Sequence, residues 1–128
     1  MKIVAAVARY LLGFMFVVFG SNSFLHFFPS GPPQPGNAGI FFSVLMAAHY
    51  FYAVGAVMVI SGVLLLINRY VALGLTLLGP VLVNILLFHI FMAPSSIGMG
   101  VFVTLLWFIV FWQHRVAFAG LFQAKLGD

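Results

Sequence analysis

Four long apolar segments, separated by short polar connections, fill almost the whole chain. They cover residues 3–28, 40–67, 71–92 and 97–118. A helix needs about 20 apolar residues to cross the hydrocarbon core of a bilayer, so each segment is long enough. None shows the period-two alternation of a membrane β-barrel, which leaves helices as the way to satisfy the backbone in lipid. The pattern predicts an all-α integral membrane protein with four spans.

The connections predict how these helices are arranged. Residues 29–39 form a loop rich in proline and glycine, Asn68-Arg69 is a tight turn, and residues 93–96 form another short connection. Short connections favour antiparallel neighbours, so we expect an up-down-up-down four-helix bundle, with residues 1–128 as a single domain. Ser95 or Ser96 is expected to cap the last helix.

Composition narrows the chemistry. Hydrophobic residues make up 65% of the chain and charged residues 5%, against about 45–50% and about 25% in soluble domains. The one acidic residue is Asp128, and there is no cysteine. An internal carboxylate base and thiol chemistry are therefore both excluded. The composition does not point to an enzyme.

The basic residues predict the orientation in the membrane. They are Lys2, Arg9, Arg69, Arg115 and Lys125, and all can lie on one side of a four-span protein. The positive-inside rule makes that side cytoplasmic, with both termini there. Their scatter does not resemble a nucleic-acid-binding patch, so we expect no nucleic-acid partner. Arg9 lies within the first segment, and its side chain is expected to snorkel to the interface; the alternative is contact with an anion or a lipid headgroup.

Five polar side chains within the apolar segments are candidate ligand-binding residues. Polar groups at membrane depth usually face the bundle interior or a cavity. We expect Asn22, His49 and Asn84 to converge on one pocket in the outward half, with His26 and His89 at its mouth and a kink at Gly79-Pro80 that widens it. The alternative is that they only hydrogen-bond helices together. The five residues are Asn22, His26, His49, Asn84 and His89.

Such a pocket suits a quinone or a lipid headgroup, whose polar atoms an imidazole and amides could bind. We predict no cofactor and no metal site. Haem remains an alternative in which two of His26, His49 and His89 meet across helices. A further alternative is an enzyme acting on a lipid-soluble substrate through His49 and Asn84.

Small residues and aromatic residues predict the packing. Gly13 and Gly20 in the first segment, with Gly55 and Gly62 in the second, are expected at positions where two helices approach closely. Trp112, followed by Gln113-His114-Arg115, is typical of the membrane interface.

Several of these motifs together resemble the DoxX-like family of small four-helix membrane proteins. The resemblance covers most of the chain and is weak in the last helix. It rests on Ala8-Arg9-Tyr10-Leu11-Leu12-Gly13, Phe19-Gly20-Ser21-Asn22, Ser61-Gly62-Val63-Leu64-Leu65-Leu66, Asn68-Arg69, Gly79-Pro80, Val83-Asn84-Ile85 and Leu87-Phe88-His89.

The resemblance implies a protein of the bacterial inner membrane, tied to respiratory or sulfur redox systems and to quinones. Relatives commonly carry a Glu shortly before the paired small residues of the second helix, where this chain has Met58. We therefore expect an accessory component that binds a quinone or lipid-like molecule, with a membrane protein or a second copy as partner. The alternative is a non-catalytic structural or interaction subunit.

Overall fold

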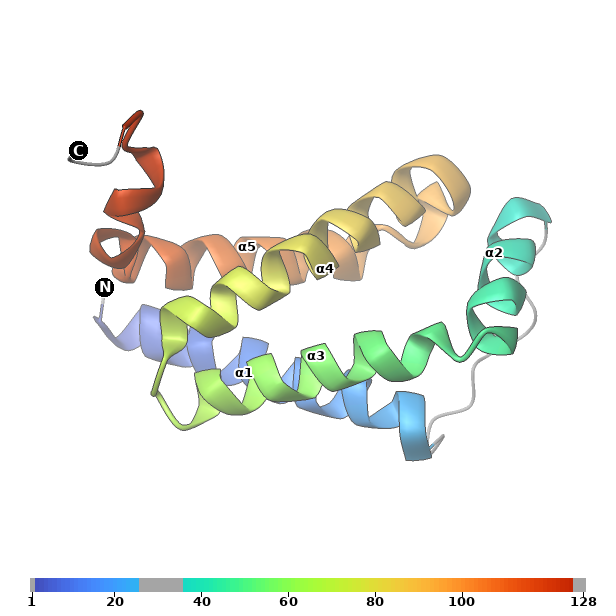
Figure 1. Ribbon diagram of the computed structural model, residues 1–128, viewed down its shortest axis with the longest axis horizontal. Coiled ribbons are helices and arrows are strands. Elements are labelled where there is room, and N and C mark those ends of the chain that lie inside the picture. The colour runs from blue at the N-terminus through green and yellow to red at the C-terminus, as the bar shows by residue number, and fades with distance from the viewer. Residues whose placement is uncertain (1, 26–35, 126–128) are drawn as a thin grey trace.

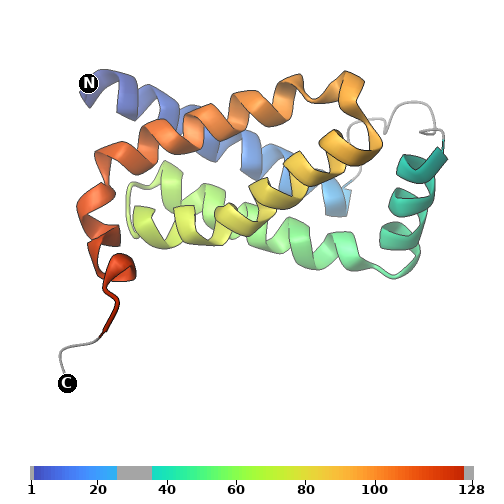
Figure 2. The same ribbon diagram turned by 90° about the horizontal axis from the view of Figure 1, so that it is seen from above.

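The computed structural model describes residues 2–25 and 36–125, and in these ranges the chain is all-helical. The helices are α1 (Lys2–Leu25), α2 (Gly36–Ala47), α3 (Tyr50–Leu66), α4 (Val71–Met92) and α5 (Gly98–Gln113), with 3₁₀ helices η1 (Pro94–Ser96) and η2 (Arg115–Phe122). Helix α1 packs on α3 and α5, and α4 also packs on α3 and α5. These four run along the long axis of the molecule (Figures 1 and 2).

Two of the predicted segments are broken rather than continuous. Residues 40–67 were expected to form one helix, but α2 and α3 meet at an angle of 85°. The last segment ends at Gln113 as an α-helix, and η2 turns away from α5 by 86°. Figure 1 shows α2 and η2 at opposite ends of the molecule. The third segment, 71–92, matches α4 and runs through Pro80 as one helix.

Membrane crossing is supported for two helices taken singly. Helices α1 and α4 are long and apolar enough to cross a bilayer, and the number rises to four if each bent pair forms one span. Their outward-facing side chains are largely apolar, as expected where lipid is the solvent. The fold is therefore that of a helical membrane protein.

Glycines set the spacing between α1 and α3, as the sequence predicted. A Cβ on Gly62 would lie 2.6 Å from the carbonyl oxygen of Gly13, and one on Gly20 would lie 2.7 Å from the carbonyl oxygen of Gly55. Both pairs recur after seven residues, so the two antiparallel helices meet along the same faces twice. Only glycine allows the two backbones to come this close.

Arg9 is buried inside this packing, which contradicts the expectation that it snorkels. Its side chain is 8% exposed, and its guanidinium donates a hydrogen bond to the carbonyl oxygen of Leu65. Leu65 lies in the last turn of α3, where carbonyls lack partners within the helix and the helix dipole is negative. The guanidinium also lies over the ring of Tyr10, 4.3 Å from its centroid.

The connection after α3 is a compact Schellman turn. Asn68 adopts a left-handed conformation with φ 55°, which asparagine tolerates better than most residues. The amide of Arg69 donates to the carbonyl of Leu64, and the amide of Asn68 donates to that of Leu65. The tight Asn68-Arg69 turn predicted from the sequence is thus confirmed.

The start of α5 differs from the prediction. The residue before it is Ile97, and no side chain caps the helix. The hydroxyl of Ser96, the last residue of η1, instead donates to the carbonyl oxygen of Ala93, which precedes η1. Pro94 opens this short 3₁₀ turn, which takes up the residues expected to cap the helix.

Trp107 joins α5 to α4 by a hydrogen bond. Its indole N–H donates to the carbonyl oxygen of Leu75 over 3.0 Å, and its ring stacks on Phe111. Leu75 lies five residues before Pro80 in α4, so its carbonyl is not the one that loses a helical hydrogen bond to the missing proline N–H, which is the carbonyl of Thr76.

We expect Trp107→Phe to destabilise the protein by about 0.5–1.5 kcal/mol, the usual net contribution of one such hydrogen bond. The free energy of unfolding in mixed micelles would measure the loss. Trp112→Phe is the control, because Trp112 is exposed. Equal losses in the two variants would contradict a specific role for the Trp107 bond.

Candidate functional site

His49 lies at the corner between α2 and α3, not within a continuous helix as the sequence suggested. It has a left-handed backbone with φ 59°, a conformation in which histidine is enriched among non-glycine residues. The side chain is exposed, and its ring stacks on Tyr52 with centroids 5.5 Å apart. The corner places the imidazole at the end of the molecule that α2 covers.

Asn84 and His89 bond to their own helix. The Asn84 amide donates to the carbonyl of Pro80 at 2.9 Å, and His89 Nδ1 lies 2.7 Å from the carbonyl of Ile85. Asn84 is exposed on α4, whereas His89 is half-buried. Both residues therefore have a local hydrogen-bond partner four residues earlier, and neither bond joins two helices.

Asn22 is half-buried near the end of α1, and His26 lies outside the described residues. Helix α1 packs chiefly on α3 and α5, whereas Asn84 belongs to α4. Asn84 and His49 are both exposed, and Asn84 bonds within α4, so the described contacts do not by themselves bring Asn22, His49 and Asn84 to one cavity at Gly79-Pro80, and their convergence stays a prediction. Their roles in ligand binding remain predictions.

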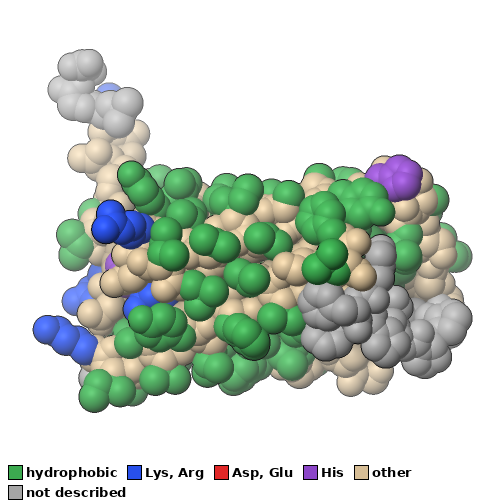
Figure 3. Space-filling model, turned by 90° about the horizontal axis from the view of Figure 1, so that it is seen from below, with side chains coloured by type: hydrophobic (Ala, Val, Ile, Leu, Met, Phe, Trp, Pro, Cys, Tyr) green, Lys and Arg blue, Asp and Glu red, His purple; other side chains and the backbone are tan. Residues whose placement is uncertain are grey.

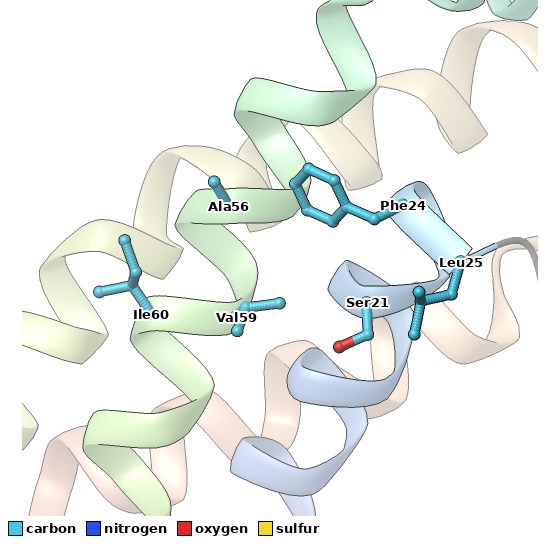
Figure 4. A pocket seen from close by; sticks show the side chains of 6 residues that line it. All are labelled: Ser21, Phe24, Leu25, Ala56, Val59 and Ile60. Atoms are coloured by element: carbon cyan, nitrogen blue, oxygen red, sulfur yellow. The ribbon is translucent and has the colours of Figure 1, made fainter.

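The structure instead places an open groove between α1 and α3. It has a volume of about 370 Å³ and is lined by Ser21, Phe24 and Leu25 of α1 and by Ala56, Val59 and Ile60 of α3. Figure 4 shows the Phe24 ring extending from α1 towards α3. The groove lies beside the close Gly20–Gly55 contact, where the small Ser21 and Ala56 leave space.

An aromatic stack joins this groove to the corner. Phe24 lines the groove and stacks on Tyr52, with ring centroids 5.4 Å apart, and Tyr52 stacks on His49. Tyr52 lies one helical turn before Ala56, so both point from the same side of α3. The groove is thus apolar along its length and has an imidazole and a phenol next to one end.

A second aromatic cluster holds α2 across the end of the bundle. Phe42 contacts Phe88 of α4 edge-on at 4.9 Å and packs on Phe51 of α3 at 5.5 Å. Phe41 also packs on Phe88. These contacts explain why the chain bends after Ala47, because a straight helix would carry Phe41 and Phe42 away from α4.

Sequence reasoning missed the groove and found only part of its polar end. His49 was selected for its polarity, but Tyr52, which stacks on it at this end, was not among the candidates, and neither was Ser21, which lines the groove. A signal was present in the small residues Ser21 and Ala56, each adjacent in sequence to a close-packing glycine. For metals, residues 2–25 and 36–125 contain no cluster of three potential ligands.

Comparison with family models, with curated proteins and with solved structures finds no match to this chain. The class of protein is therefore defined by the fold and the groove alone. It is a helical membrane protein with an apolar groove between α1 and α3, its two most closely packed helices.

Proposed function

We propose that this protein binds an amphipathic lipid, with an isoprenoid quinone as the favoured class, at the end of the bundle that α2 covers. The observation that carries the proposal is the groove between α1 and α3 with the Phe24–Tyr52–His49 stack at its end. The role that fits is an accessory component of a membrane redox or respiratory system. This proposal agrees with the resemblance to the DoxX-like family.

The groove and the stack suit the two parts of such a ligand. The volume of the groove, about 370 Å³, falls at the lower end of the usual range for small-molecule sites, about 300–1,000 Å³. An apolar tail gains little from leaving lipid for an equally apolar groove, so polar contacts must supply selectivity. The His49 imidazole and the Tyr52 hydroxyl are hydrogen-bonding groups that could meet quinone carbonyls or a lipid headgroup.

The proposal includes four membrane crossings in an up-down-up-down bundle, in a bacterial inner membrane, with both termini in the cytoplasm. Helix α3 has 17 residues and α5 has 16, which gives lengths of about 26 Å and 24 Å. Each is slightly short of a hydrocarbon core of about 30 Å. The bent partners α2 and η2 then fit the two interfaces, where a helix lies along the membrane.

The second candidate is a structural or interaction subunit. The close packing of α1 on α3 favours it, because the glycines there serve to bring two helices together. The hydrogen bonds of Asn84 and His89 within α4 favour it too, because these polar side chains already have partners in their own helix. A membrane protein partner or a second copy would then cover the apolar surface. An enzyme using His49 and Asn84 is less favoured, since the two side chains bond or stack with different neighbours.

Filling the groove tests the proposal. We expect Ala56→Phe to lower the affinity for decylubiquinone at least tenfold in lipid nanodiscs, because the new ring occupies the volume of the groove. Ala53→Phe is the matched control: it makes the same change on an exposed residue of α3 that does not line the groove. Isothermal titration would give both affinities.

His49→Gly tests the polar end, because glycine keeps the left-handed backbone while removing the imidazole. We expect weaker decylubiquinone binding with little change in the free energy of unfolding. If Ala56→Phe and Ala53→Phe bind equally well, or if the wild-type protein does not bind decylubiquinone, the structural role is the better account.

A further inference from the structure

The segment η2 differs from α2 in charge, although each lies at one end of the bundle and meets its neighbouring helix at a sharp angle. Helix α2 contains no charged residue, whereas η2 begins at Arg115 and is followed by Lys125. The start of α1, which contains Lys2, and the α3–α4 turn, which contains Arg69, lie at the same end of the molecule as η2 (Figure 1), and Figure 3 shows Lys and Arg side chains gathered at that end. The sequence has no acidic residue before Asp128 to neutralise them.

The outer face of η2 is apolar. A 3₁₀ helix has three residues per turn, so residues three apart share one face. Val116, Ala119 and Phe122 form such a face, and Val116 is 82% and Phe122 80% exposed. Phe118 lies on another face, is buried and packs on Phe111 of α5 with centroids 4.9 Å apart. This contact holds η2 across the end of α5, with the Val116–Phe122 face turned away from the bundle.

Arg115 is the first residue of η2 and directly precedes Val116 in the sequence. Its guanidinium lies 4.4 Å from the ring centroid of Trp112 and donates to the carbonyl oxygen of Trp112. The side chain is nevertheless exposed, and a guanidinium has five N–H donors, so several can still reach a phosphate. Lys125 is also exposed beyond the other end of the helix.

We propose that η2 is a docking surface for an anionic phospholipid leaflet. Val116, Ala119 and Phe122 enter the boundary between headgroups and acyl chains, and Arg115 and Lys125 contact the lipid phosphates. An apolar face combined with flanking basic residues is the arrangement by which interfacial helices recognise anionic membranes. The neutral helix α2 at the opposite end would show no preference for anionic lipid.

The cysteine-free chain allows a direct test by spin labelling. Ala119→Cys places a nitroxide in the middle of the apolar face of η2, and Val44→Cys places one on an exposed position of α2. Each protein is reconstituted into vesicles of phosphatidylcholine alone and of phosphatidylcholine mixed with phosphatidylglycerol. Collisions of the label with oxygen, which concentrates in lipid, and with a water-soluble nickel chelate report its location.

With phosphatidylglycerol present, we expect the label at residue 119 to move towards oxygen and away from nickel, while the label at residue 44 is unchanged. Two basic residues at about 1 kcal/mol each shift the ratio of docked to undocked η2 by about 30-fold. The double substitution Arg115→Gln with Lys125→Gln should abolish the shift, and Arg115→Lys with Lys125→Arg should retain it.

Two results would overturn the proposal. One is a label at residue 119 that behaves identically in both lipid compositions. The other is a label protected from oxygen and nickel alike, since that would show η2 covered by protein. Neither result depends on quinone binding, so the outcome is independent of the groove.

Discussion

Gly62→Leu is expected to prevent α1 from packing on α3 and to leave little folded protein. Any side chain at this position starts from a Cβ that would lie 2.6 Å from the carbonyl oxygen of Gly13 and 2.9 Å from the amide nitrogen of Val17. Both atoms belong to the backbone, so neither can move aside as a side chain does. The helices must separate, and the contacts along both glycine pairs are lost together.

A graded series would measure this effect. Gly62→Ala is expected to cost about 1–3 kcal/mol, the usual range for overpacking. Gly98→Ala is the control, because a Cβ there meets no atom within 4 Å; alanine should be neutral or slightly stabilising. Free energies of unfolding from SDS titration in mixed micelles would compare the variants. If Gly62→Ala is as stable as Gly98→Ala, the close approach of α1 and α3 is wrong.

Arg9→Ala has the second largest expected effect. Removing the guanidinium takes away the charged donor at the carbonyl of Leu65 and the contact with the Tyr10 ring. We expect a loss of about 1.5–3 kcal/mol, the contribution of a hydrogen bond to a charged group. The same unfolding titration would measure it.

Arg69→Ala is the matched control for Arg9→Ala. It removes one positive charge from the same end of the molecule, but Arg69 is exposed in the turn after α3. We expect its effect to stay within about 0.5 kcal/mol. Equal losses in the two variants would show that total charge matters and that the buried hydrogen bond does not. Arg9→Lys should fall between them, because lysine keeps the charge but not the planar group that stacks on tyrosine.

The groove and the glycine contacts are both formed by the packing of α1 on α3. Gly20 and Gly55 bring the backbones together, and Ser21 and Ala56 beside them leave an open volume on the outer side. A ligand in this groove would lie against the rigid contact, not against a loop. Binding should therefore not require α1 and α3 to separate, and the Ala56→Phe variant should keep its fold.

The polar candidates show how far residue type alone predicts a site. His49 and Asn84 were selected because polar side chains are rare in apolar segments, and it is the structure that places His49 beside Tyr52 at the end of the groove. Residue type could not distinguish an amide that faces a cavity from one that bonds to its own helix, as Asn84 does. The same local sequence is compatible with either arrangement, because it does not say which side of the helix faces the neighbouring helices.

The sequence by itself determined that the chain is helical and apolar, because lipid leaves few ways to satisfy a backbone and apolar composition records that solvent directly. It also determined the close-packing glycines, since the absence of a Cβ is a property of the residue. The tertiary structure decided the bends after Ala47 and Gln113 and the burial of Arg9. An apolar stretch remains apolar whether the helix continues or turns. Whether the helix turns, and whether a side chain is buried, depends on partners that are distant in sequence, such as Phe88 for Phe42 and Leu65 for Arg9.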